Sequence, residues 1–237
     1  MSKALYYFPH AGASAANFRD WHESMKPEIL LISFDYNGHG RLKDKAFYRS
    51  VKEAVNDIYN RMKNDVPKRE KYFLGGQCLG AVIAYELYYK IKAEGELKLP
   101  DKLILIGQGA PDIIKGIPYS TMEFDEIIQV LYQEGNIDQK LLSEEYKEAV
   151  NALVVRPLKA DSEIYESYKT DPGNEYLNVE THIFYGEQDM HYTVDDIKRW
   201  DSYVNGDVHY HSYTGGHNII KEHLSEILCD IKEICKE

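Results

Sequence analysis

Several features are scarce in this sequence of 237 residues, and each scarcity excludes a class of protein. No run of about 18 apolar residues occurs, so we expect no helix that spans a membrane. Three cysteines are too few for a disulfide framework, which favours the reducing cytoplasm. The first residues enter an apolar, strand-like run without the core of a signal peptide, which agrees with a cytoplasmic location.

Positive charge is also scarce, because 28 Lys and Arg stand against 39 Asp and Glu and leave a net charge of −11. Such a surface repels phosphates, so we expect neither a nucleic-acid partner nor an anionic membrane. The length suits one α/β domain with a substantial core. We therefore expect residues 1–237 to form a single domain, and the protein to be a monomer.

Short apolar runs alternate with helical patterns along the chain. Between the runs, apolar residues recur at helical spacing, as at Phe18, Trp21 and Met25, and Ser14 and Ser50 can cap helices. This alternation predicts an α/β fold with a mainly parallel sheet and helices on both faces. The expected strands are residues 4–8, 29–34, 72–74, 102–107, 179–185 and 208–213.

Residues 119–170 interrupt the alternation, because they contain helical patterns and no strand-like run. The patterns are expected to form a helix that ends at Gly135, a segment at residues 143–155 and a helix that contains Ile164, Tyr165 and Tyr168. About 50 residues are long for a connector between two strands. We interpret the insertion as a helical lid over the strand ends, within the same domain.

The turn at residues 76–80, Gly-Gln-Cys-Leu-Gly, joins a predicted strand to a predicted helix. We expect Gly75 and Gly76 to end the strand. The pattern is that of the nucleophile elbow in the α/β-hydrolase fold, with Cys78 in the place of the nucleophile. Gly76 and Gly80 are needed because side chains there would clash with neighbouring backbone in so tight a turn. The helix N-terminus favours the thiolate of Cys78.

Asp189 and His217 also follow predicted strands, and the ends of parallel strands lie along one edge of a sheet. The order nucleophile, acid, base is the order of the α/β-hydrolases. We predict that His217 takes the proton of Cys78 and later protonates the leaving group, and that Asp189 orients His217. Each residue alone has a structural alternative, since an Asp after a strand often forms a turn. The combination favours a catalytic triad.

The loop at residues 9–14 follows the first predicted strand and contains both proline and glycine. In the elbow arrangement, one backbone N–H from such a loop and one from the residue after the nucleophile form an oxyanion hole. The candidates here are Ala11 and Leu79. Two fixed donors matter because negative charge develops on the former carbonyl oxygen. The alternative is an ordinary Gly/Pro loop without a catalytic role.

Other reactive side chains favour structural interpretations. His209, His211 and His217 suggest zinc, but the first two share one face of a strand and His217 lies beyond it, so we predict no metal site. His191 is expected to be a loop residue, and Arg41 a solvated one, although Arg41 could bind a phosphate or carboxylate. Cys229 and Cys235 lie in an apolar helical pattern and are expected to be buried or idle thiols.

At this point the sequence resembles a known family, the type II thioesterases that accompany nonribosomal peptide and polyketide synthases. The resemblance spans essentially the whole chain. It rests on Phe-Pro-His-Ala-Gly-Ala-Ser at 8–14 with Phe18 and Trp21, Asp-Tyr-Asn-Gly-His-Gly-Arg at 35–41, Gly-Gln-Cys-Leu-Gly-Ala at 76–81, Leu-Lys-Ala-Asp at 158–161 with Tyr168, Gly-Glu-Gln-Asp at 186–189 and Gly-Gly-His at 215–217.

The resemblance implies hydrolysis of acyl or aminoacyl thioesters on the phosphopantetheine arm of a carrier domain, which clears stalled or misprimed synthases. It implies an acyl or peptidyl carrier domain as partner and no cofactor beyond that arm. Three positions depart from the family pattern. Gln77 replaces a histidine, Asn37 replaces a proline, and Cys78 replaces the nucleophilic serine.

The cysteine leaves the final acceptor open. An acyl group on Cys78 is itself a thioester, so it stays activated towards an amine or another thiol. The same residues therefore fit an acyltransferase that shuttles acyl groups between carrier domains. Two remoter alternatives are a non-catalytic, hydrolase-like binding module and a small-molecule hydrolase of the dienelactone type. The sequence identifies neither the acyl group nor the partner synthase.

Overall fold

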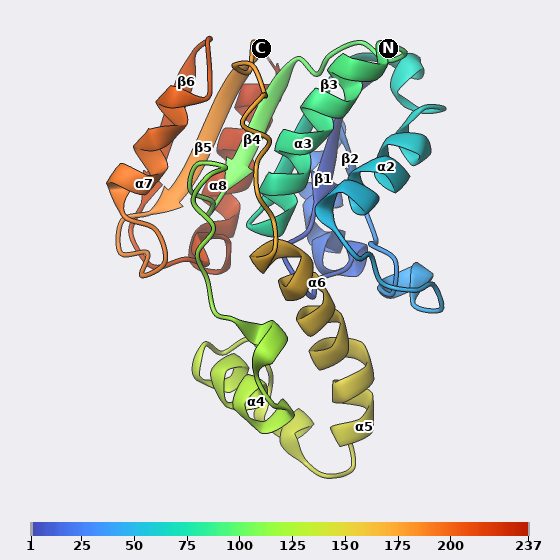
Figure 1. The fold of residues 1–237 in the computed structure, drawn as a ribbon, viewed down its shortest axis with the longest axis vertical. Helices are drawn as coiled ribbons and strands as arrows, with labels where there is room; N and C mark the ends of the chain where they lie inside the picture. The colour runs from blue at the N-terminus through green and yellow to red at the C-terminus, as the bar shows by residue number, and fades with distance from the viewer. Residues whose placement is uncertain (1, 237) are drawn as a thin grey trace.

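A computed structural model describes residues 2–236, and its centre is a six-stranded sheet in which all neighbouring strands are parallel (Figure 1). The strand order is β2-β1-β3-β4-β5-β6. This arrangement confirms the predicted α/β-hydrolase fold class. The strands are β1 (Ser2–Phe8), β2 (Ile29–Ser33), β3 (Arg69–Gln77), β4 (Lys102–Ile106), β5 (Glu180–Gly186) and β6 (Val208–Tyr213).

Helices cover both faces of the sheet, with α2 and α3 on one face and α1 and α8 on the other (Figure 1). The α-helices are α1 (Arg19–Met25), α2 (Val51–Met62), α3 (Leu79–Glu94), α4 (Phe124–Gln133), α5 (Lys147–Val150), α6 (Arg156–Glu166), α7 (Val194–Lys198) and α8 (Ile219–Lys236). Short 3₁₀ turns lie at Ala15–Phe18, Gly40–Leu42, Val66–Lys68, Tyr119–Thr121, Gln139–Leu142 and Arg199–Ser202.

The apolar runs of the central strands are continuous because both faces of the sheet are buried. In β1, Tyr6 and Phe8 join the core under α2 and α3, whereas Leu5 and Tyr7 join the core under α1 and α8. All four side chains are at most 1% exposed. Because successive side chains of a strand point to opposite faces of the sheet, the single apolar run of β1 contributes to both cores.

The prediction that Gly75 and Gly76 end their strand is wrong, because β3 continues through both to Gln77. Gly75 lies in register with Tyr7 of β1 and Ile104 of β4, so neighbouring strands flank it on both sides. Pairing with two parallel neighbours stabilises the extended backbone more than the conformational freedom of glycine opposes it.

Residues 119–170 contain helices and no strand, as predicted, but the internal boundaries differ. α5, a π-helical turn (Asn151–Val155) and α6 follow one another without a break. Pro157 explains the irregular turn, because proline has no N–H and its ring crowds the preceding turn of a helix. Tyr168 lies beyond the end of α6.

This helical segment has its own small core and projects beyond the carboxyl ends of the strands (Figure 1). Ile127 and Leu131 of α4 meet Val155 and Leu158 in that core. The segment therefore holds itself together while α6 returns the chain to the edge of the sheet.

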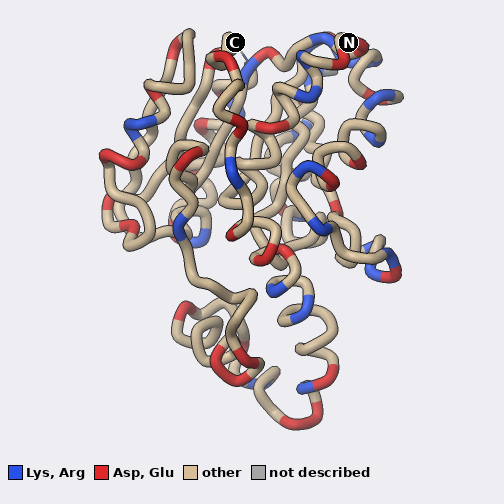
Figure 2. The backbone as a smooth tube through the Cα atoms, in the orientation of Figure 1, with Lys and Arg blue, Asp and Glu red and all other residues tan. Residues whose placement is uncertain are grey.

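Charged residues of both signs are interspersed along the backbone (Figure 2). Within residues 2–236, no helix combines the length and apolar character that crossing a bilayer requires.

Candidate active site

Cys78 lies on a sharp turn between β3 and α3. Its φ and ψ are 51° and −117°, and it is the one residue other than glycine with positive φ in the described part of the chain. Such a conformation costs free energy in an L-residue and persists only where the surrounding structure enforces it. The Cys78 N–H donates to the carbonyl of Ile106 at 3.0 Å, which fixes the turn to the end of β4.

Gly76 and Gly80 allow this turn, as the sequence predicts. A Cβ on Gly76 would lie 2.7 Å from the nitrogen of Ala81 and closer still to the backbone of Gly80. A Cβ on Gly80 would lie 2.6 Å from the carbonyl carbon of Phe8. The start of α3 thus packs directly against the end of β1, which no larger residue would permit.

His217 and Asp189 form a hydrogen-bonded pair, with 2.8 Å between Nδ1 of His217 and Oδ2 of Asp189. The carboxylate is 1% exposed and the imidazole 27%. The other carboxylate oxygen accepts the N–H groups of His191 at 2.7 Å and Tyr192 at 3.3 Å. Asp189 is therefore held in one orientation, with its second oxygen directed at His217.

The electrostatics of the pair are strongly coupled. Burial alone would lower the pKa of His217, but the hydrogen bonds to Asp189 and Cys78 and the charges of both raise that pKa to about 10. Burial alone would raise the pKa of Asp189, but His217 and the two backbone N–H groups lower it. A protonated imidazole between two acidic groups is thus stabilised. His217 is the residue that links Cys78 to Asp189.

Glycines also let the loops that carry the pair approach the sheet. A Cβ on Gly186, at the end of β5, would lie 2.7 Å from the carbonyl oxygen of Gly215. Gly215 itself has φ of 107°. A Cβ on Gly107, just after β4, would lie 3.3 Å from the carbonyl oxygen of His217. His217 therefore rests over the ends of β4 and β5.

The two candidate oxyanion donors come from two segments, the start of α3 and the loop after β1. Leu79 is the first residue of α3, so its N–H has no acceptor within the helix. Ala11 follows β1 and is partly buried against the same core as Cys78. Their role in stabilising an oxyanion remains a prediction from the sequence.

A buried hydrogen-bond cluster lies beside Cys78, and sequence reasoning missed it. The hydroxyl of Tyr165 in α6 donates to Oε1 of Gln108 at 2.7 Å and lies 2.6 Å from the hydroxyl of Tyr192. The pKa values of both tyrosines are raised, chiefly by burial and in part by the neighbouring Cys78. The one available signal was a glutamine that directly follows an apolar strand, at Gln108 after Gly107.

Gln77, which departs from the family pattern, directly precedes Cys78 at the end of β3. Its Nε2 lies 3.4 Å from Oδ1 of Asn218, the residue after His217. Gln77 is 4% exposed. The side chain before Cys78 therefore links the elbow to the loop that carries His217.

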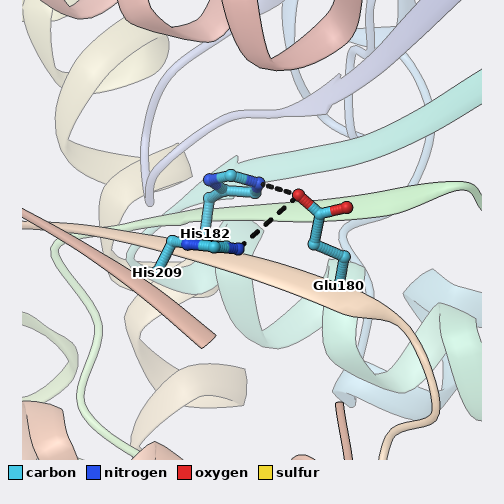
Figure 3. A group of neighbouring side chains, drawn as sticks. All are labelled: Glu180, His182 and His209. Carbon is cyan, nitrogen blue, oxygen red and sulfur yellow. Dashed lines mark hydrogen bonds and ion pairs between the residues drawn. The ribbon is translucent and has the colours of Figure 1, made fainter. Parts of the chain in front are cut away.

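The three histidines that suggested zinc do not converge, since His217 pairs with Asp189. His209 instead lies beside Glu180 and His182, whose candidate ligand atoms all fall within 4.8 Å of one another (Figure 3). The sequence pattern does not reveal this group, because Glu180 and His182 come from the strand next to that of His209. Oε1 of Glu180 already lies 2.8 Å from Nε2 of His182 and 3.0 Å from the ammonium of Lys102. The carboxylate of Glu180 is therefore already paired with His182 and Lys102.

The structure also shows the surroundings of the other reactive side chains considered from the sequence. Arg41 is a solvated side chain whose Nε donates to Oδ2 of Asp35 at 2.7 Å. Cys235 is buried, and burial raises the pKa of its thiol to about 12, whereas Cys229 is exposed. The ring of His191 contacts that of His217 edge to face, with centroids 4.8 Å apart.

Comparison with known proteins agrees with this geometry. A family model described as "Thioesterase domain" matches residues 3–235. A probable cadicidin biosynthesis thioesterase of Streptomyces griseus is 23% identical over 231 residues, and the match spans 97% of this chain and 61% of that protein. The thioesterase TesA of Mycobacterium marinum is 23% identical over 228 residues, with 96% and 89% of the two chains covered.

Among solved structures, the type II thioesterase BorB from the borrelidin biosynthetic cluster superposes with a TM-score of 0.86. It is 21% identical in sequence, and the match covers 99% of this chain and 93% of the BorB chain. At this identity the superposition shows a shared fold.

Proposed function

The chain belongs to the thioesterase domain family, and from this premise we propose that it cleaves acyl or aminoacyl thioesters through a covalent intermediate on Cys78. The observation that carries the proposal is the placement of Cys78 on a strained turn beside the His217–Asp189 pair. A nucleophile next to a base that is itself oriented by a buried acid is the arrangement that acyl transfer requires.

In the first half-reaction, the thiolate of Cys78 attacks the carbonyl carbon of the substrate thioester. The carbonyl electron pair moves onto oxygen, where the N–H groups of Ala11 and Leu79 stabilise the negative charge. When the tetrahedral intermediate collapses, the C–S bond to the substrate thiol breaks. The departing sulfur receives the proton of His217, and Asp189 has stabilised that proton until then.

In the second half-reaction, His217 takes a proton from water, and the hydroxide attacks the acyl group on Cys78. The C–S bond to Cys78 breaks, and a free carboxylic acid leaves. Each step moves protons through His217 alone, so the mechanism requires no metal or dissociable cofactor.

The substrate we propose is an acyl or aminoacyl group on the phosphopantetheine arm of a carrier domain. Support comes from the relatives, whose names place them in the biosynthesis of cadicidin and borrelidin. Residues 119–170 lie beyond the strand ends near Cys78 and are suited to act as a lid over that arm. We further propose that this reaction removes stalled acyl groups. We also propose that the protein is a monomer of one domain and acts in the cytoplasm.

Cys78 itself favours a second candidate, acyl transfer to another thiol or an amine. An acyl group on a serine would be an oxyester, so loading from a thioester would run downhill. On Cys78 the acyl group remains a thioester, and loading is close to balance and reversible. The intermediate therefore keeps enough activation for transfer to a second carrier domain.

The test is a mass spectrum of the intact protein after incubation with excess acylated carrier protein. We expect a mass increase equal to one acyl group in the parent and in Cys229→Ala, and none in Cys78→Ala. If Cys78→Ala unloads the carrier at the parental rate, the proposal is wrong. A non-catalytic binding module would give no adduct and no unloading in any variant.

The same reaction separates hydrolysis from transfer when a second, empty carrier protein is added. Hydrolysis yields free acid and leaves the second carrier empty, whereas transfer loads it. The ratio of free acid to loaded second carrier identifies the acceptor.

A further inference from the structure

A second histidine–carboxylate pair lies outside the triad and is more deeply buried. Nε2 of His39, in the loop after β2, lies 3.0 Å from Oδ2 of Asp161 in α6, and the two side chains are 2% and 4% exposed. The other ring nitrogen of His39 lies 3.0 Å from the carbonyl oxygen of Asn37. The Nδ1 contact has hydrogen-bond geometry, whereas the Nε2 contact is an ion-pair distance to the Asp161 carboxylate, whose charge favours an imidazolium ion.

Electrostatics agree with this protonation state. Burial alone would lower the pKa of His39, but Asp161 and, more weakly, Asp35 raise it above its ordinary value. The proposed mechanism uses neither His39 nor Asp161. An apolar pair of similar size would pack this position at least as well as a buried ion pair, so packing alone does not explain the charges.

The carboxylate of Asp161 has a second partner that does explain them. Its Oδ2 accepts the backbone N–H of Gly12 at 2.8 Å, in the loop that follows β1. Gly12 has φ of 78°, and a Cβ there would lie 3.1 Å from Cβ of Leu158 in α6. Asp161 therefore holds the peptide next to Ala11, the residue that contributes one proposed oxyanion donor.

Two further contacts hold the same loop at its ends. The hydroxyl of Tyr36 donates to the carbonyl oxygen of Pro9 at 2.8 Å, and the N–H of Ala15 donates to Oδ1 of Asp35 at 2.8 Å. Both partners come from the segment that also carries His39. Of these three hydrogen bonds, the one to Asp161 comes from the helical segment 119–170, so α6 supplies the central anchor of the loop.

We propose that Asp161, with His39 as its countercharge, is a positioning residue that aims the N–H of Ala11 at the thioester carbonyl oxygen above Cys78. This inference rests on the proposed function. It also links the helical segment to catalysis, because a displacement of α6 moves the carboxylate away from Gly12 and misaligns the donor. The oxyanion hole is then complete only when α6 is seated on the loop.

Two reactions of the same thiol test this role. Acylation of Cys78 by a p-nitrophenyl ester forms an oxyanion, whereas alkylation by iodoacetamide displaces iodide and forms none. Both need the thiolate, so the ratio of the two rates isolates the stabilisation of the oxyanion. Single-turnover acylation is followed by release of p-nitrophenol, and alkylation by intact mass.

We expect Asp161→Ala to slow acylation about 10- to 100-fold, because loss of one oxyanion donor typically costs 10²- to 10³-fold and misalignment costs less. Alkylation should change by less than about twofold. Asp161→Asn keeps an oxygen for the Gly12 N–H, so it should recover part of the lost acylation rate. His39→Gln should acylate at a rate similar to that of Asp161→Asn. The matched control is Asp101→Asn, since Asp101 accepts the Tyr72 N–H at 2.8 Å far from Cys78.

The outcomes are distinct. If the parent is alkylated but never acylated, the proposed function fails, and this inference with it. If the parent is acylated and Asp161→Ala matches it, only the inference is overturned. If acylation and alkylation fall together, Asp161 supports the fold around Cys78 and does not position the donor. Far-UV circular dichroism checks that each variant is folded. If Asp161→Ala is unfolded, Asp161→Asn takes its place in the comparison.

Discussion

Replacement of Gly80 by alanine tests the close packing of the start of α3 on the end of β1. An added Cβ would lie 2.6 Å from the carbonyl carbon of Phe8 and 2.7 Å from the carbonyl oxygen of Pro9, and closer still to the oxygen of Phe8. All three atoms belong to the backbone. No change of rotamer relieves the overlap, so either β1 or the start of α3 must move.

The size of the effect follows from these distances. Real Cβ atoms essentially never lie within 3.0 Å of another heavy atom, so the two elements must separate by more than 0.4 Å at the Phe8 carbon alone. Overpacking of a well-filled core costs about 1–3 kcal/mol. Because the obstacle here is backbone in a central strand, we expect a loss of about 3 kcal/mol in the free energy of unfolding.

The assay is urea denaturation followed by far-UV circular dichroism, with Gly116→Ala as the matched control. A Cβ on Gly116 would have one neighbour, Cε1 of Tyr165 at 3.9 Å, so that variant should be as stable as the parent or slightly more stable. The same movement displaces the Leu79 N–H, so Gly80→Ala should also acylate more slowly. A Gly80→Ala protein within about 1 kcal/mol of the parent would refute this account of the elbow.

Three further predictions concern other parts of the molecule. In Asp189→Asn, the pKa of His217 should fall from about 10, since a neutral amide no longer stabilises the imidazolium. An unchanged titration of the His217 imidazole, followed by NMR, would contradict the coupling of the two side chains. Ser50→Ala should cost about 1 kcal/mol in urea denaturation, because Ser50 accepts the Glu53 N–H at the start of α2, and a neutral effect would argue against the cap. His182 is buried, and burial lowers its pKa to about 4. The folded protein therefore favours neutral His182, and this contribution to stability is fully present above pH 6.5. As the pH falls from 6.5 to 4, roughly 3 kcal/mol of the free energy of unfolding is lost. His182→Gln should flatten that part of the stability profile, and a parental slope in the variant would disprove the assignment.

Much of the fold was predictable from local patterns. The strand runs, including residues 208–213 of β6, are apolar or alternating because each strand faces one or two cores. Ser50 caps α2 as expected, with its hydroxyl 3.1 Å from the N–H of Glu53. The two elbow glycines are equally local, since the geometry of one tight turn requires them whatever lies elsewhere in the chain.

Other features could not be predicted from local patterns, because residues distant in the sequence determine them. β3 extends through Gly75 because strands on both sides flank it, although glycine itself favours a break. The approach of Lys102 and of His209 to Glu180 depends on the register of adjacent strands. The Tyr165–Gln108 hydrogen bond joins residues 57 positions apart, and no periodicity encodes such a pair.

The candidate site divides in the same way. Chain order alone places Cys78, Asp189 and His217 each after a strand, and parallel strands necessarily bring such ends to one edge. The contact of Asp161 in α6 with His39 and the N–H of Gly12 follows instead from tertiary packing, because it depends on how the helical segment folds back onto the loop. Periodicity and turn chemistry fix elements and their order, whereas buried charge pairs arise from the packing of one element on another.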